Sequence, residues 1–255
     1  MRLTVIGCAG SFPNAHSPAS CYLVEHDGHR LLLDLGNGAL GALQRHVDLV
    51  WPGVLDAVVL SHCHVDHCVD AASLYVQRHY APEPTTELLP ILGPSDARHR
   101  LASVYGMTDP SPLDEEFDFH LLAGVQQLGP FTVTSLPAAH PVEAYSIRVE
   151  AGGRSLVYSG DTGPTAGLVA LAASADLALF EASFVGDDNP PDLHLSARDA
   201  AWIAQEAGVA RLLLTHLVAW NDDEQVLREA QEVFAGPVML AHAGMVVDLY
   251  ATSAS

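Results

Sequence analysis

Basic residues are scarce in this chain of 255 residues. It carries 11 lysine and arginine residues against 31 aspartate and glutamate residues, which gives a formal net charge of −20 at pH 7. Because nonspecific affinity for nucleic acids comes largely from basic side chains that displace counterions, this composition argues against a protein that follows a phosphate backbone. Large polyanions are therefore poor candidate substrates. Small anions are not excluded, since a metal cluster can dominate the field inside a cleft.

Cysteines and long apolar runs are scarce as well. The four cysteines are too few and too scattered for a disulfide framework, so we expect reduced thiols. No stretch of about 18 or more apolar residues occurs, and the N-terminal residues lack the pattern of a signal peptide. We therefore expect a cytoplasmic protein that has no membrane partner.

Apolar residues are plentiful, at 49% of the chain, and only 16% of the residues are charged. This composition supplies a substantial core and argues against intrinsic disorder. Short apolar runs alternate with helical stretches from end to end, which favours a layered α/β fold. The candidate strands are Leu3–Gly7, Cys21–Glu25, Arg30–Asp34, Ala57–Ser61, Phe131–Leu136, Tyr145–Glu150, Ser155–Ser159, Ala175–Phe180, Arg211–Thr215 and Val238–Leu240.

Turn and cap residues refine this outline. Two pairs of strands are expected to form hairpins, because Asp27-Gly28 and Gly152-Gly153 tolerate the positive φ angles of tight turns. Ser196 and Gly208 are expected to begin and end a helix over 197–207. Further helices are expected at 38–47, 67–79 and 222–235. The segment 81–120 is rich in proline, glycine and acids, and we expect an irregular insertion or lid that is too short to be a domain.

The most specific pattern is Ser61-His62-Cys63-His64-Val65-Asp66-His67, which directly follows the apolar run 56–60. As the chain leaves a strand, His62 and His64 can project to the same side, while Asp66 and His67 turn into the following helix. Nitrogen and oxygen ligands for a metal would then converge. A polar loop with chance histidines is the alternative, and this spacing makes it the weaker interpretation.

Three further polar residues stand directly after or close behind apolar runs. They are His140, Asp161 and His216. Each alone is better explained as a surface histidine or a turn aspartate. Strand ends converge on one edge of a layered α/β fold, however, and sites assemble there, so their joint placement favours a shared site.

These motifs resemble the metallo-β-lactamase superfamily and, within it, the ribonuclease-Z-like phosphodiesterases. The resemblance covers nearly the whole chain. Besides the residues above, it rests on Gly7-Cys8-Ala9-Gly10-Ser11, Asp34 in Leu-Leu-Leu-Asp-Leu-Gly, Gly160-Asp161-Thr162-Gly163-Pro164, Glu181-Ala182-Ser183-Phe184 and Leu214-Thr215-His216. It implies one domain over residues 1–255, folded as a four-layer αββα sandwich.

The resemblance also implies two divalent metal ions, with zinc as the default and manganese or iron as alternatives. The implied ligands are His62, His64 and His140 for one ion, Asp66, His67 and His216 for the other, and Asp161 between them. Asp34 would orient a ligand histidine through its other ring nitrogen. Cys63 should alternate away from the neighbouring histidines, so we expect it to pack in the core or to support the ligands from behind, rather than to bind metal.

Catalytic roles follow from the same resemblance. In the ribonuclease-Z-like enzymes, a histidine at the position of His194 contacts the scissile phosphate and assists the leaving oxygen, and an acid at the position of Glu181 orients it. His194 precedes the expected start of a helix, where anions are favoured. Asp66 is expected to serve catalysis as well as metal binding. The implied nucleophile is a hydroxide that bridges the metals, so no serine or cysteine nucleophile is needed.

One departure from ribonuclease Z narrows the range of expected substrates. Ribonuclease Z carries a long arm for tRNA between its third and fourth ligand motifs. Here only the residues 141–160 separate those motifs, and we expect them to form a hairpin. Together with the acidic charge, this makes tRNA an unfavoured partner. The stretches 41–46, 191–196 and 212–216 resemble actinobacterial atypical class II cyclic-AMP phosphodiesterases. The implied reaction is hydrolysis of a small cyclic nucleotide, 3′,5′-cyclic AMP, to 5′-AMP.

Several alternatives stay open. A ribonuclease-Z-type RNA endonuclease is the nearest of them. Lactam hydrolysis is disfavoured by a bridging Asp161 and by the lack of an evident cysteine ligand, and thioester hydrolysis by the sequence around His140. A metal-bound scaffold or nucleotide sensor without turnover is disfavoured because every implied ligand position is filled. Related enzymes make a homodimer the expected assembly.

Overall fold

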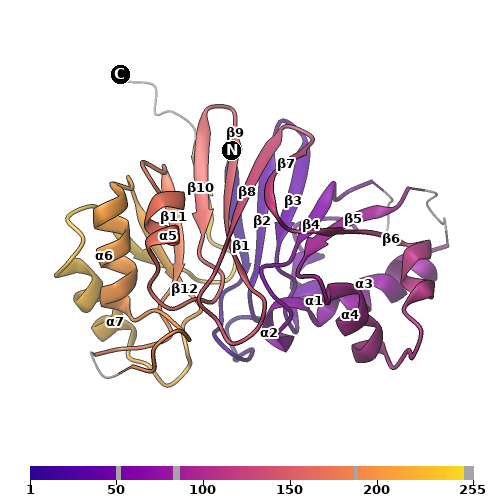
Figure 1. The fold of residues 1–255 in the computed structure, drawn as a ribbon, viewed down its shortest axis with the longest axis horizontal. Helices are drawn as coiled ribbons and strands as arrows, with labels where there is room; N and C mark the ends of the chain where they lie inside the picture. Colours follow the sequence, from indigo (N-terminus) through magenta and orange to yellow (C-terminus); the bar gives the residue numbers. More distant parts are fainter. Residues whose placement is uncertain (50–52, 83–86, 187–188, 250–255) are drawn as a thin grey trace.

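Two mixed β-sheets form the centre of the computed structural model, which describes residues 1–49, 53–82, 87–186 and 189–249 (Figure 1). The first sheet has the order β14 (Val246–Asp248), β1 (Arg2–Gly7), β2 (Cys21–His26), β3 (His29–Leu33), β4 (Ala57–Val59), β5 (Leu89–Gly93) and β6 (Phe117–Leu121). The second has the order β13 (Val238–Leu240), β12 (Leu212–Thr215), β11 (Leu177–Glu181), β10 (Arg154–Tyr158), β9 (Tyr145–Ala151), β8 (Phe131–Pro137) and β7 (Gly124–Leu128).

Helices cover the outer face of each sheet. Those on the first sheet are α1 (Ala39–Leu43), α2 (Val65–Cys68), α3 (Asp70–His79), α4 (Ala97–Tyr105) and the 3-10 helix η1 (Ser111–Glu115). Those on the second are α5 (Ala166–Leu171), α6 (Ala197–Ala207) and α7 (Asp223–Gln231). The predicted four-layer αββα sandwich is confirmed. Within the described ranges, no helix is both long and apolar enough to cross a lipid bilayer.

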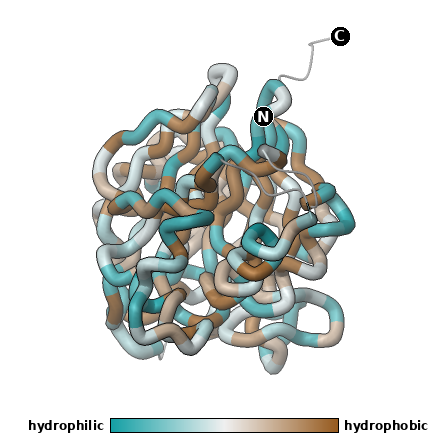
Figure 2. Tube along the Cα trace, turned by 90° about the vertical axis from the view of Figure 1, so that its right-hand side faces the viewer, coloured by the Kyte–Doolittle hydropathy of each residue, from teal (hydrophilic) through white to brown (hydrophobic). Residues whose placement is uncertain are grey.

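Three apolar layers hold this sandwich together. The central layer lies between the sheets and includes Tyr22, Phe131 and Tyr158, all of them fully buried. One further layer lies between each sheet and its helices. The apolar segments, brown in Figure 2, accordingly recur through the body of the molecule. Burial of this kind is the main favourable contribution to folding, so it fixes the sheet edges from which the loops of the site project.

Local signals in the sequence explain several elements. Strands β2 and β3 form the predicted hairpin, with positive φ at Asp27 and Gly28, and β9 and β10 form the second one, with positive φ at Gly152 and Gly153. Helix α6 begins at the predicted cap: Ser196 accepts a hydrogen bond from the Asp199 backbone, and the Asp199 side chain accepts one in return. It ends at Gly208, which has positive φ.

The expectation of an irregular insertion at 81–120 is wrong. The described residues of this segment form β5, α4, η1 and β6, and both strands extend the first sheet beyond β4 as parallel neighbours. Strand β5 is short and contains Pro90, and β6 carries polar residues on its exposed face, so neither has an apolar run long enough to stand out. Residues 83–86 lie outside the described part.

Other boundaries differ in detail. The helix expected at 38–47 is restricted to α1, and the one expected at 67–79 is divided into α2 and α3. Helix α7 ends at Gln231, short of the expected 235. Strands β7 and β14 were not predicted. The first is largely exposed, with Val125 at 69%, and the second has three residues, so hydrophobic periodicity is weak in both.

Candidate metal centre

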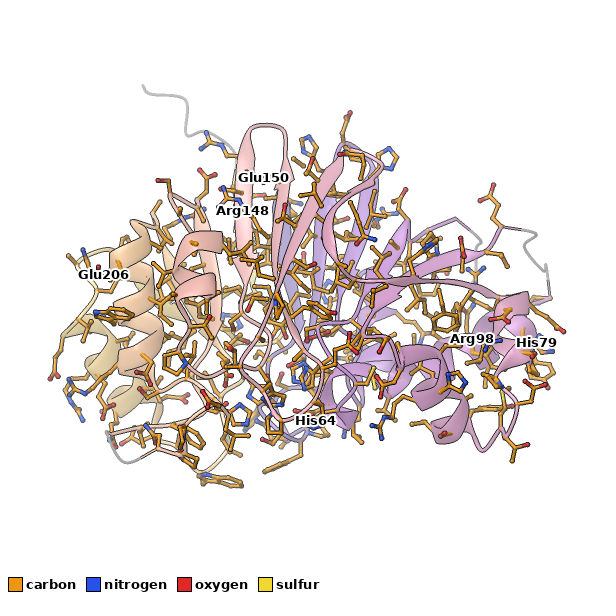
Figure 3. The ribbon with its side chains drawn as sticks, viewed as in Figure 1. His64, His79, Arg98, Arg148, Glu150 and Glu206 are labelled. Carbon is orange, nitrogen blue, oxygen red and sulfur yellow. The ribbon has the colours of Figure 1, made fainter. Side chains whose placement is uncertain are left out.

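The parallel strands of the second sheet bring the predicted residues to one edge. Strands β10, β11 and β12 run parallel, and at their carboxyl ends stand Asp161, Glu181 and His216. The loop after β4 in the first sheet brings the His62–His67 segment to the same edge. Figure 3 shows His64 at the lower edge of the molecule, between its two halves. The site is therefore assembled from both sheets.

The first set of candidate ligands consists of His62, His64, His140 and Asp161. His62 Nε2 lies 3.1 Å from His64 Nδ1, which lies 3.2 Å from His140 Nε2. The Asp161 Oδ2 atom lies 3.7 Å from His62 Nε2. Bonds of about 2.0–2.1 Å from zinc to nitrogen in a tetrahedral site would place such atoms about 3.3 Å apart, so this spacing fits one divalent cation.

The second set consists of Asp66, His67, Asp161 and His216, all buried. The Nε2 atom of His67 lies 3.2 Å from Asp161 Oδ1 and 3.4 Å from Asp66 Oδ2. The Nε2 atom of His216 lies 3.1 Å from Asp66 Oδ2 and 3.5 Å from Asp161 Oδ1. Asp161 thus presents one carboxylate oxygen to each set, as a side chain that bridges two cations would.

Hydrogen bonds on the far side of three imidazole rings direct one nitrogen of each toward the site. Nδ1 of His67 donates to Asp34, Nδ1 of His140 to the Leu193 carbonyl, and Nδ1 of His216 lies 2.7 Å from the hydroxyl of Ser183. Each ring can then offer the lone pair of Nε2 to a cation, which is the usual way in which neighbouring groups set the tautomer of a ligand histidine.

Two buried atoms of the second set support the presence of a cation. His67 Nε2 and Asp161 Oδ1 have no hydrogen-bond partner among the described residues, although both side chains are almost completely buried. Buried polar atoms nearly always have a hydrogen-bond partner, so these two atoms indicate a partner outside the polypeptide, such as a cation. The clustered His and Asp side chains could bind metal ions; their donor types do not select a particular metal.

The electrostatics of the site are dominated by its carboxylates. Burial raises the pKa of Asp66, but the neighbouring imidazoles of His216 and His67 lower it more, and the carboxyl stays ionised. The same imidazoles hold the pKa of Asp161 well below its usual range despite its burial. Burial lowers the pKa of His67, but the carboxylates of Asp161 and Asp34 raise it by more, so it lies well above its usual value. His62, by contrast, has a pKa well below its usual value because of burial and the charge on His67.

Asp34 lies behind the ring of His67. Its carboxylate accepts hydrogen bonds from the Ser61 backbone at 2.6 Å, the Ser61 hydroxyl at 2.8 Å, the Tyr158 hydroxyl at 2.7 Å and His67 Nδ1 at 2.7 Å. The backbone of Asp34 has a φ of 58°, which is uncommon for a residue other than glycine. A buried carboxylate held by four donors fixes the ring of His67 and, with it, the direction of Nε2.

His194 and Glu181 lie beside the two sets. Nδ1 of His194 donates to Glu181 Oε2 at 2.9 Å and lies 3.8 Å from Asp161 Oδ2. The other carboxylate oxygen of Glu181 accepts from the Thr162 backbone at 2.7 Å, so the acid is held in place. Burial lowers the pKa of His194, but the hydrogen bond to Glu181 raises it more; the pKa of Glu181 is raised by its own burial and by Asp161.

The structure adds supporting residues that the sequence analysis did not single out. Tyr158 donates to Asp34 across the two sheets, and the Ser183 hydroxyl contacts both Glu181 and His216 at 2.7 Å. Ser183 lies in the motif Glu181-Ala182-Ser183-Phe184, whereas nothing in the sequence distinguishes Tyr158 from an ordinary core aromatic. Cys63 lies in the apolar layer under the first sheet, and contact with Cys68 and burial both raise the pKa of its thiol. The expected packing position of Cys63 is confirmed.

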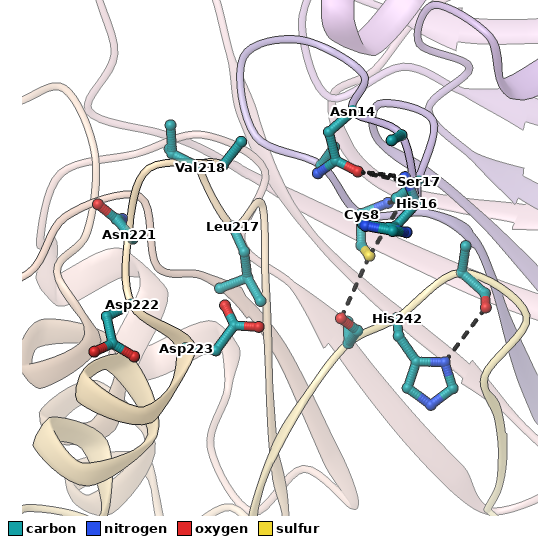
Figure 4. A pocket seen from close by; sticks show the side chains of 15 residues that line it. Cys8, Asn14, His16, Ser17, Leu217, Val218, Asn221, Asp222, Asp223 and His242 are labelled. Atoms are coloured by element: carbon teal, nitrogen blue, oxygen red, sulfur yellow. Dashed lines mark hydrogen bonds between the residues drawn. The ribbon is translucent and has the colours of Figure 1, made fainter.

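A separate cavity of about 600 Å³ lies near the site (Figure 4). It is lined by the loop after β1, including Asn14 and His16, by the loop after β12, including Val218, and by Asp223 at the start of α7. The β13–β14 connection contributes His242. None of the residues in the two candidate ligand sets lines this cavity, so the metal centre and the cavity are distinct parts of the same end of the molecule.

A four-layer αββα sandwich with clustered His and Asp side chains at its strand ends is the arrangement of the metallo-hydrolases with a β-lactamase fold. Residues 29–217 match the family model described as the beta-lactamase superfamily domain. The chain therefore belongs to the metallo-β-lactamase superfamily.

Known proteins resemble the chain over nearly its full length. An uncharacterised Mycobacterium tuberculosis protein is 43% identical over 246 residues, 93% of this chain and 88% of that protein. The crystal structure of YhfI from Bacillus subtilis, a metallo-β-lactamase fold protein, has a TM-score of 0.85 at 32% identity and covers 96% of this chain and 98% of its own. Ribonuclease Z of Myxococcus xanthus is 27% identical and covers 98% of both chains. The relatives thus include ribonuclease-Z-like proteins and a metallo-hydrolase of the same fold.

Proposed function

We propose that this protein is a dinuclear-metal phosphodiesterase that hydrolyses a small cyclic nucleotide, 3′,5′-cyclic AMP, to 5′-AMP. The observation that carries the proposal is the His194–Glu181 pair beside the two candidate ligand sets, with His194 Nδ1 at 3.8 Å from Asp161. This places a proton donor next to the position at which a phosphoryl group would meet the cations. The resemblance of 41–46, 191–196 and 212–216 to cyclic-AMP phosphodiesterases supports this particular substrate.

The two candidate ligand sets would hold two divalent ions, zinc by default, with Asp161 between them. Such ions lower the pKa of a water molecule and stabilise the charge on the oxygens of a phosphoryl centre. Asp34 and Ser183 keep the rings of His67 and His216 in the orientation that this requires. Asp66, a member of the second ligand set that the neighbouring imidazoles keep ionised, is placed to accept the proton of the attacking water.

His194 would serve the leaving oxygen. As water adds to phosphorus, the bond between phosphorus and O3′ breaks, and its electron pair stays on O3′. With Nδ1 of His194 held by Glu181, the opposite nitrogen, Nε2, can give its proton to that oxygen. The His194 side chain is 14% exposed and Glu181 only 1%, so the substrate can reach the histidine but not the acid that orients it.

The first test is product analysis of the metal-loaded protein with 3′,5′-cyclic AMP, beside a chelated sample and the variant His194→Ala. We expect metal-dependent formation of 5′-AMP and a loss of about 100-fold or more in kcat for the variant, which is typical of a missing general acid. The metal content of the variant, measured by atomic emission, should be unchanged. Full turnover by His194→Ala at full metal content would contradict the proposed role.

A ribonuclease-Z-type endonuclease is the second candidate, because ribonuclease Z of Myxococcus xanthus matches over 98% of both chains. Against it stand the net charge of −20 and the β9–β10 hairpin, which occupies most of the residues between His140 and Asp161. Precursor tRNA should therefore be included in the same experiment. Cleavage of tRNA without hydrolysis of cyclic AMP would replace the proposed function with this one. A lactam chromophore and a thioester complete the substrate set.

A further inference from the structure

Two large aromatic side chains are exposed side by side near the metal centre. Phe12 is 39% exposed and Trp220 is 74% exposed, and their ring centroids lie 5.6 Å apart with an angle of 39° between the rings. Leaving an indole ring in water forgoes the stabilisation that its burial would give. Exposed apolar groups that gather beside a candidate active site commonly mark a surface that a ligand covers.

The backbone beside Phe12 is in contact with the metal centre. The Ser11 backbone nitrogen lies 3.2 Å from His216 Nε2, and the Gly10 N–H donates to the Leu217 carbonyl at 3.0 Å. A Cβ atom on Gly10 would lie 2.4 Å from the His216 carbonyl oxygen, so the loop packs against His216 too closely for any side chain at this position. Phe12 directly follows Ser11 and is thereby held next to the second candidate ligand set.

The loop that carries Trp220 is fastened to the same centre. The Asn221 side chain donates to the Ser183 carbonyl at 2.8 Å, and the Asn221 backbone donates to the Val218 carbonyl at 2.9 Å. The hydroxyl of Ser183 contacts both His216 and Glu181. Trp220 precedes Asn221, so its position is tied through two hydrogen bonds to the acid that orients His194.

The charges near the pair indicate which part of a ligand would lie there. The chain continues from Trp220 into Asp222 and Asp223 at the start of α7, and both side chains are exposed. Carboxylates disfavour a phosphate group at this end and tolerate a neutral heteroaromatic ring, whose amino groups are donors. The phosphate would therefore lie at the cations and His194, and the planar part of the ligand at the aromatic pair.

We infer that Phe12 and Trp220 form a stacking surface for the base of the nucleotide, next to the centre that binds its phosphate. This inference rests on the proposed function, because it assumes a substrate that has a base. Neither residue lines the cavity of Figure 4, so the stacking surface lies outside that cavity. Stacking accepts every base, since every base has a π face, and gives affinity without basic side chains.

Calorimetric binding of 5′-AMP and of ribose 5-phosphate to the metal-loaded protein separates the base from the phosphate. We expect Trp220→Ala to weaken the binding of 5′-AMP about tenfold, a typical effect of a lost stacking partner, and to leave ribose 5-phosphate unchanged. Trp220→Phe should restore most of the affinity. Two controls should behave as wild type: Trp202→Ala, which removes an indole that is 51% exposed on α6, and His242→Ala, which changes the cavity.

The outcomes distinguish this inference from the proposed function. If the wild type binds 5′-AMP more tightly than ribose 5-phosphate through Trp220 but does not hydrolyse cyclic AMP, the stacking surface stands and the proposed function falls. The inference would be overturned if Trp220→Ala lost affinity for 5′-AMP and ribose 5-phosphate equally, or if it kept its affinity for both. A shift in sedimentation velocity of Trp220→Ala with unchanged 5′-AMP binding would show instead that a second copy of the chain covers the pair.

Discussion

At the scale of single residues, the candidate metal centre depends on side chains that do not themselves face a cation. Asp34 is the clearest of them, since it collects hydrogen bonds from Ser61, Tyr158 and His67 while fully buried. Charged acceptors of this kind make the stronger hydrogen bonds found in proteins. The orientation of His67, on α2, is therefore set by a group that directly follows β3, and a change at Asp34 acts on metal binding without removing a ligand.

We predict that Asp34→Asn weakens metal affinity about 10- to 100-fold, as expected when the partner of a ligand histidine loses its charge. The amide keeps one oxygen as an acceptor for the Ser61 backbone, but an NH2 group then stands in the place of Oδ2 and cannot accept the hydrogen bond from His67. Affinity can be measured by competition with a chromogenic chelator. Tyr158→Phe is the matched variant, because it removes a single donor to Asp34 and should have a smaller effect. Wild-type affinity in Asp34→Asn would show that His67 is oriented by other contacts.

At the scale of elements, the site exists because strand ends coincide. Asp161, Glu181 and His216 follow three parallel neighbours, β10, β11 and β12, whose carboxyl ends must meet at one edge. At the opposite, amino-terminal ends of β10 and β11, a carboxylate joins the two strands. Asp176, just before β11, accepts hydrogen bonds from the Ser155 backbone at 2.8 Å and from Arg154 at 2.7 Å at the start of β10. This carboxylate fixes the alignment of the two strands.

The stability that Asp176 supplies should depend on pH. Burial raises its pKa, but hydrogen bonds from Arg154 and Ser155 lower it more, so the folded protein holds the ionised form more strongly than the unfolded chain does. The contribution is thus present above the ordinary carboxyl range and is lost as the pH falls through the folded-state pKa. Asp176→Asn should lower the free energy of unfolding by about 1 kcal/mol at pH 7 and by less below about pH 4.

Urea unfolding curves at several pH values test this expectation. The control variant is Glu206→Gln, which neutralises an exposed carboxylate on α6 and should follow the wild type throughout (Figure 3). If the difference in the free energy of unfolding between the wild type and Asp176→Asn stayed the same in acid, shape or packing, rather than charge, would matter at this position.

Much of this element-scale arrangement could be predicted from the sequence, and particular residues show why. The candidate ligands stand just beyond apolar runs, and strand ends are readable from such runs; His140, Asp161 and His216 were identified in this way. Strands β5 and β6 were missed, because Pro90 interrupts the first and polar residues alternate along the second. They become strands through pairing with β4, a tertiary effect that no local pattern records.

The supporting contacts were less predictable, because they join residues that are far apart in the chain. The hydroxyl of Tyr158 reaches Asp34 across 124 positions, and the Tyr22 hydroxyl reaches Thr215 across 193, at 2.6 Å. A tyrosine in an apolar run looks like any core residue until the facing sheet is in place. The pairing of Phe12 and Trp220 could not be predicted for the same reason, because only the folded loops bring the two rings together.

At the scale of the whole molecule, the two halves of the sandwich are joined by one extended apolar layer and, at one edge, by the candidate ligand sets. The chain carries a net charge of −20, and several of its carboxylates converge at that edge. Without cations, their mutual repulsion opposes the contact between the halves. Divalent ions that bind only the folded protein would stabilise it by mass action.

We predict that chelation lowers the melting temperature of the metal-loaded protein by about 5–10 °C, the shift expected for a few kcal/mol in a chain of this size. Differential scanning fluorimetry with and without chelator measures it, and re-addition of zinc, manganese or iron ranks the metals. Asp161→Asn, which weakens both ligand sets at once, should show little response to the chelator. A melting temperature that chelation leaves unchanged in the wild type would argue against cations at this edge.

The division of the ligands between the two sheets also sets an order of events during synthesis. The segment with His62, His64 and His67 leaves the ribosome first, and neither ligand set is complete at that stage, because both include Asp161. His216, at the end of β12, emerges last of all. A nascent chain can therefore hold both ions in their final environment only after most of the protein has been made, so metal uptake would report the late docking of the C-terminal half.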